Sequence, residues 1–132
     1  MAFDLKILSM DELLKTATNM QKYLEATPSD QEEKLLLRLT RLQILLAKSG
    51  KMLADAKHWL DTRKSNAITD TLKEALTGKD WTASMINKKI DALCRDEHYL
   101  VNFIDRINSA ASNQIKALIT IISYRKEQMR LT

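Results

Sequence analysis

One cysteine and two histidines are the residues of this sequence best suited to bind a transition metal. Cys94 and His98 stand four residues apart, on one face of a helix, and His58 falls at a similar level if the chain folds into an antiparallel hairpin. Thiolate and imidazole are ligands that zinc prefers, but a structural zinc site normally has four of them. The sequence also contains no CxxC or HxxxH motif. We therefore predict no metal site and interpret Cys94 as a small buried side chain.

No other set of residues has the spacing of a catalytic site. Asp91, Asp96 and Asp105 fit the solvated face of a helix, and no Glu-x-x-His pair occurs for a di-iron centre. The two glycines are too far apart to form a phosphate-binding loop. Cys94 has His98 within reach as a base, but nothing in the sequence supplies an oxyanion hole. We predict a non-enzymatic protein with no catalytic residue, no cofactor and no small-molecule substrate.

Basic side chains are the stronger candidate for a binding surface. They recur at helical spacing along two predicted helices and could follow a phosphate backbone. These residues are Lys34, Arg38, Arg41, Lys48, Lys51, Arg125 and Lys126. The net charge of +4 fits such a partner, although aromatic residues, which stack on bases, make up only 5% of the chain. The alternative is a solvated helix face, on which reversing the charges of Arg38 and Arg41 would change stability by no more than about 0.5 kcal/mol.

A polar tract near the expected core is a second candidate surface. Its amides are Asn108, Asn113 and Gln114. Buried amides need hydrogen-bond partners. We favour hydrogen bonds within the chain that fix the register of neighbouring helices, and the alternative is a groove for a partner.

Apolar periodicity predicts the helices that position these side chains. Apolar residues recur every three or four positions from 82 to 129, which is typical of one long helix packed along its length against others. A second seam with the same repeat runs from Leu35 to Leu60. With two glycines and one proline, the chain has little turn chemistry. We predict an all-α fold in one domain, residues 1–132: an elongated antiparallel helical bundle made of a long helical hairpin and a shorter N-terminal helix. The expected helices are about 10–26, 30–62, 66–77 and 82–129.

Local signals set the ends of these helices. Ser9 followed by Glu12 fits a capping box at the start of the first helix. The apolar repeat slips between Leu60 and Ile68, so we expect a kink or a full turn at residues 63–66. Gly78 is a good helix stop, and the short connection that follows predicts antiparallel neighbours.

Folding the hairpin near residue 79 predicts which levels of the two long helices meet. The small residues Ser49 and Gly50 then lie opposite residues 109–112, which allows a close approach of the backbones. Arg63 lies near Glu97 on the seam, where an unpaired charge would cost about 3 to 5 kcal/mol. We therefore predict an ion pair between Arg63 and Glu97.

Three segments of the chain resemble small helical proteins encoded in bacterial prophages. They are residues 49–57 (SGKMLADAK), 94–101 (CRDEHYLV) and 105–108 (DRIN). The resemblance covers about the last two thirds of the chain and implies a phage or mobile-element origin. That group has no assigned activity, so no functional residue is carried over from it.

The expected apolar surface points to a binding partner. The N-terminal helix would reach only to about residues 46–49, which leaves Trp59, Ile68, Trp81 and Val101 on a two-helix arm. A self-associating dimer would cover this surface, and so would a third helix folded back onto the bundle. We predict a helical interaction or assembly module that binds itself or a protein partner. Binding of DNA or RNA backbone without sequence preference is the alternative.

The sequence also indicates a compartment. No apolar run approaches the length of about 20 residues that a membrane span needs, and the first residues do not have the pattern of an export signal. A single cysteine fits a reducing environment. We therefore expect a cytoplasmic protein that does not insert into a membrane.

Overall fold

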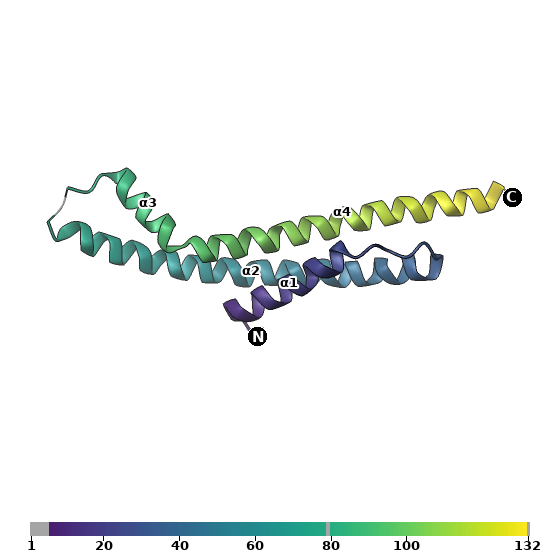
Figure 1. Cartoon of the computed structure of the whole chain (residues 1–132), viewed down its shortest axis with the longest axis horizontal. Helices are drawn as coiled ribbons and strands as arrows, with labels where there is room; N and C mark the ends of the chain where they lie inside the picture. The colour runs from purple at the N-terminus through teal and green to yellow at the C-terminus, as the bar shows by residue number, and fades with distance from the viewer. Residues whose placement is uncertain (1–5, 79, 132) are drawn as a thin grey trace, which may run out of the picture.

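The chain folds as an all-α, elongated antiparallel helical bundle. The structure is a computed structural model that describes residues 6–78 and 80–131, and this part of the chain contains four helices and no strand (Figure 1). The helices are α1 (Met10–Glu25), α2 (Glu32–Leu76), α3 (Ala83–Leu93) and α4 (Arg95–Leu131). The predicted fold class, a long hairpin with a shorter N-terminal helix, is confirmed.

The two long helices, α2 and α4, form the hairpin and run antiparallel along most of their length (Figure 1). Helix α1 lies across the middle of this hairpin and contacts both long helices. Helix α3 packs against the distal end of α2, so the molecule has a three-helix body and a two-helix arm.

Helix α1 begins and ends at the residues that carry the predicted signals. The hydroxyl of Ser9 accepts a hydrogen bond from the backbone N–H of Glu12 at 3.2 Å, which satisfies one free donor of the first turn. The helix stops before Pro28, whose ring disfavours helical geometry in the preceding residue. Its inward face consists of Leu13, Ala17, Met20 and Leu24. Their spacing of four, three and four residues places these side chains on the hairpin.

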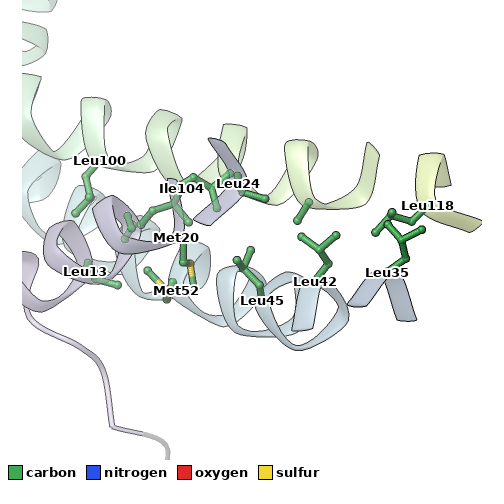
Figure 2. Close-up of a cluster of buried hydrophobic side chains, with 14 residues drawn as sticks. Leu13, Met20, Leu24, Leu35, Leu42, Leu45, Met52, Leu100, Ile104 and Leu118 are labelled. Atoms are coloured by element: carbon green, nitrogen blue, oxygen red, sulfur yellow. The ribbon is translucent and has the colours of Figure 1, made fainter. Parts of the chain in front are cut away.

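The core of the body lies where α1 covers the hairpin. Figure 2 shows leucine, isoleucine and methionine side chains of α1, α2 and α4 pointing toward one another there. The largest fully buried apolar side chains of the body are Leu13, Leu42, Met52, Ile104 and Ile107. Each such side chain contributes roughly 1.5 to 3 kcal/mol when it leaves water. This burial holds α1 on the hairpin.

The register of the hairpin is close to the predicted one. The Asn108 side-chain amide donates to the hydroxyl of Ser49 at 2.9 Å and to the carbonyl of Leu46 at 3.2 Å. A Cβ added to Gly50 would lie 3.9 Å from the same amide nitrogen. The small residues of α2 therefore meet the polar tract of α4, as expected from folding the chain near residue 79.

The full turn that was one alternative at residues 63–66 is wrong, because α2 continues through this segment as one helix. The inward face passes to Ala67 and Thr71, which are both fully buried. Ile68 and Leu72 point outward and are 39% and 48% exposed. The apolar repeat therefore slips because Ile68 and Leu72 lie outside the core, while the smaller Ala67 and Thr71 occupy the inward positions.

The single helix expected at 82–129 is instead divided at Cys94. This residue leaves helical geometry, with φ −103° and ψ 13°, and its N–H is shared between the carbonyls of Ile90 and Asp91. Helix α3 starts at the cap Thr82, whose hydroxyl accepts from the N–H of Met85 at 3.2 Å. The break lets α3 diverge from the line of α4 (Figure 1).

Candidate interaction surfaces

The junction of α3 and α4 explains the position of Arg63. The break at Cys94 frees the carbonyl of Leu93, and Arg63 Nε donates to this oxygen at 3.1 Å. The predicted ion pair between Arg63 and Glu97 is wrong. Ion pairs within residues 6–78 and 80–131 are Lys51–Asp55, Arg125–Asp30 and Arg130–Glu127. Among the described residues no other donor reaches the freed carbonyl, so Arg63 acts as a helix cap.

Cys94 is fully buried at this junction. Burial raises the pKa of its thiol, and the nearby carboxylate of Glu97 raises the pKa further. A thiol kept protonated is a weak nucleophile and a poor metal ligand. Among the residues that the structure describes, no three His, Cys, Asp or Glu side chains are grouped so that they could hold a metal ion.

The structure separates the predicted basic stripe into buried and exposed members. Arg38 is buried: its guanidinium donates to Gln114 Oε1 at 2.8 Å and lies 4.8 Å from the ring centroid of Tyr23. Its predicted place on the helix surface is wrong. The residue ties α1, α2 and α4 together because each of these helices supplies one of the three side chains.

Two further members of the stripe are engaged within the chain. The amine of Lys51 donates to the carboxylate of Asp55 and to the carbonyl of Lys6. Arg125 forms an ion pair with Asp30 and also donates to its carbonyl at 2.8 Å. The four remaining members are exposed: Lys34, Arg41, Lys48 and Lys126.

The amides of the polar tract do not converge on one groove. Asn108 binds α2 as described above, and Gln114 donates to the carbonyl of Leu24 at 2.9 Å in addition to accepting from Arg38. Asn113 is exposed. Asn108 and Gln114 therefore act within the fold, as the favoured reading of the tract expected.

The first segment of the chain also docks on α2, through contacts that the sequence pattern did not indicate. The buried carboxylate of Asp55 accepts from the backbone N–H of Leu8 at 3.2 Å, and Trp59 Nε1 donates to the carbonyl of Leu8 at 2.7 Å. The contacts made by Lys6 and Leu8 hold this segment on α2, and residues 1–5 lie outside the described residues. The sequence did contain a signal for the ion pair between Lys51 and Asp55, because oppositely charged residues four apart in a helix can pair.

A first surface groove lies where the starts of α1 and α4 meet. It has a volume of about 360 Å³ and is lined by Met10, Asp11, Leu14, Asp96, Glu97, Tyr99 and Leu100. Acidic residues are favoured in the first turn of a helix, and two first turns side by side bring three carboxylates to one place. Leu14 and Tyr99 are 46% and 63% exposed. We call this surface the acidic groove.

A second groove lies on the other flank of α1, against α2. It has a volume of about 250 Å³ and is lined by Met20, Tyr23, Arg41, Ile44, Leu45 and Lys48. Residues 34–54 of α2 include five basic residues and no acidic one. Ile44 is 64% exposed. We call this surface the basic groove.

The arm carries a third exposed apolar surface. Ile68, Leu72 and Leu76 follow one another at intervals of four residues on α2, and Leu76 is 86% exposed. Only a small core lies beneath them, formed by Ala67, Ile90 and Cys94. We call these three residues the arm row.

Comparisons with family models, with curated proteins and with solved structures find no match to this chain. The resemblance to prophage proteins therefore stays a prediction. Within residues 6–78 and 80–131, none of the helices combines the length and the hydropathy that crossing a bilayer requires.

Proposed function

We propose that this chain is a non-enzymatic helical assembly module that binds a second copy of itself or a protein partner. A phage or mobile-element origin is part of the proposal and rests on the resemblance of residues 49–57, 94–101 and 105–108 alone. The observation that carries the proposed role is the arm row. In the arm, α2 and α3 each bury one face against the other helix. The arm row lies outside that contact.

The energetics of burial support this role. Single exposed leucines are common on protein surfaces and need no explanation. A continuous row on one helix face is different, because apolar stripes at helical spacing are the usual contact surfaces between helices. A second arm laid along the first would cover Ile68, Leu72 and Leu76 and produce a four-helix arrangement, which is the common way to bury such a stripe.

Binding of nucleic-acid backbone is the weaker candidate. Three of its seven proposed contacts, Arg38, Lys51 and Arg125, are engaged in hydrogen bonds within the chain. A side chain that already forms a hydrogen bond within the protein must break that bond before it can bind a phosphate. The exposed set that remains is small, and it includes the two basic side chains of the basic groove.

Sedimentation equilibrium of the full chain over a range of concentrations tests the proposal. We expect a mass above the monomer's 15.2 kDa that rises with concentration. The double substitution Ile68→Ser with Leu72→Ser should weaken association. Leu36→Ser with Ile119→Ser is the matched control, because these residues are 45% and 47% exposed and lie outside the arm. A monomeric mass at every concentration would contradict assembly through the arm row.

A further inference from the structure

The charged side chains of the two grooves have no hydrogen-bond or ion-pair partner in the described part of the chain. Asp11, Asp96 and Glu97 of the acidic groove, like Arg41 and Lys48 of the basic groove, take part in no hydrogen bond or ion pair within residues 6–78 and 80–131. Both grooves combine these charges with exposed apolar side chains. The two surfaces are therefore opposite in charge and alike in apolar character.

We propose that the occupant of the basic groove is the acidic groove of a second copy of this chain. The inference rests on the proposed role in assembly and names two surfaces and a partner for it, separate from the arm row. The carboxylates of one copy would pair with Arg41 and Lys48 of the next. Such pairing steers the two surfaces together and fixes their register.

Each surface also offers an apolar projection and a recess. Ile44 is 64% exposed at the edge of the basic groove, and Leu14 and Tyr99 project beside the acidic groove. An interface needs a central apolar contact as well as a charged rim, because exposed ion pairs alone contribute little. Seating Ile44 against Leu14 and Tyr99 supplies that contact and draws the charges on both sides out of water.

The positions and charges of the grooves limit how two copies can dock through them. The acidic groove lies between α1 and α4, whereas the basic groove lies between α1 and α2, on the other flank of α1. Docking like surfaces together would place like charges opposite one another. Docking unlike surfaces uses a different patch on each copy, so the contact either closes into a pair in which both grooves of each copy are used, or repeats head to tail in a chain or a ring.

The test uses the full chain carrying Ile68→Ser and Leu72→Ser, which removes the arm row and isolates the grooves. One variant adds Arg41→Glu with Lys48→Glu, and a second adds Asp11→Lys with Asp96→Lys. Each variant alone should associate about 100-fold more weakly than the background chain, because its two grooves now carry the same sign of charge. Circular dichroism confirms that each variant is folded, since both aspartates also stabilise a first helical turn.

An equimolar mixture of the two variants should restore association. Every groove in that mixture again faces one of opposite charge, and misfolding of either variant cannot produce this recovery. The control variant adds Lys57→Glu with Lys73→Glu, two exposed residues of α2 outside both grooves, with the same change in net charge. It should associate like the background chain, which would show that the added negative charge alone does not weaken association.

Three results would overturn the inference. The first is association that neither charge-reversed variant weakens. The second is a mixture that does not recover. The third is a loss of association in the Arg41 and Lys48 variant while the Asp11 and Asp96 variant associates like the background chain. This result would assign the basic groove to some other acidic surface. In each case association of the native chain through the arm row would still stand, so the inference fails separately from the proposed function.

Discussion

Replacing Arg38 with alanine should destabilise the protein by about 2 to 4 kcal/mol. Arg38 is only 9% exposed, and its guanidinium donates to Gln114 Oε1 at 2.8 Å, a charge-assisted bond that contributes about 1.5 to 3 kcal/mol. Its position 4.8 Å from the ring centroid of Tyr23 adds about 1 kcal/mol. The second donation, to the carbonyl of Tyr23 at 3.4 Å, is too long to add much.

The assay is urea unfolding followed by circular dichroism, and Arg41→Ala is the matched control. Arg41 has the same side chain on the same helix but is exposed, so its loss should change stability by no more than about 0.5 kcal/mol. A double-mutant cycle with Gln114→Ala should give a coupling energy of about 1 kcal/mol between the two side chains.

Equal losses for Arg38→Ala and Arg41→Ala would refute the reasoning, because burial, hydrogen bonding and the contact with the Tyr23 ring distinguish Arg38 from Arg41. A coupling energy near zero would refute the Gln114 contact in particular. The result also decides how the charge-reversed pair Arg38→Glu with Arg41→Glu behaves. Its loss of stability should come almost entirely from Arg38.

Three further predictions concern the hairpin, the buried thiol and nucleic acid. Asn108→Ala should cost about 1 to 3 kcal/mol in urea unfolding, because it removes the bonds to Ser49 and Leu46, whereas the exposed Asn113→Ala should change stability by less than about 0.5 kcal/mol. Since the pKa of Cys94 is raised in the folded state, the unfolded chain loses the thiol proton first as pH rises; stability should therefore fall above the ordinary thiol pKa, and Cys94→Ala should remove this dependence. Slow alkylation of Cys94 in the folded protein, becoming fast in urea, checks its burial independently. Fluorescence anisotropy with labelled oligonucleotides at low and moderate salt should show no tight binding; salt-sensitive binding lost in Lys34→Glu with Arg41→Glu would instead support the phosphate-backbone alternative.

The hairpin could be predicted from the sequence because its signals repeat many times. Apolar residues at alternating three and four positions define both long helices, and their relative level follows from where the chain turns. The small pair Ser49 and Gly50 was expected opposite residues 109–112, and in the structure it meets the side-chain amide of Asn108, one residue away. Errors at any one position are averaged out over such a repeat.

Single-residue features could not be predicted in the same way. The apolar phase is continuous through Ile90, Leu93 and Leu100, so nothing in it marks the break at Cys94. The break persists because Arg63, about thirty positions earlier, supplies a donor to the freed carbonyl. A pattern read along one helix contains no information about a donor on another.

The burial of Arg38 was hidden for a related reason. Spacing places Lys34, Arg38 and Arg41 on one broad side of α2, but α1 covers only part of that side. Which arginine lies beneath Tyr23 depends on the angle at which α1 crosses the hairpin. That angle results from packing of the whole core and not from the local sequence.

The continuity of α2 from Glu32 to Leu76 has a consequence for how this protein can change length in evolution. Because the helix is unbroken, one inserted residue would rotate everything beyond it by about 100° and turn the arm row relative to the body. Two turns are the smallest addition that keeps both ends in phase, and α4 would need the same addition at the same level. Related chains of different length should therefore differ by paired insertions of about seven residues, each lengthening the molecule by about 10 Å.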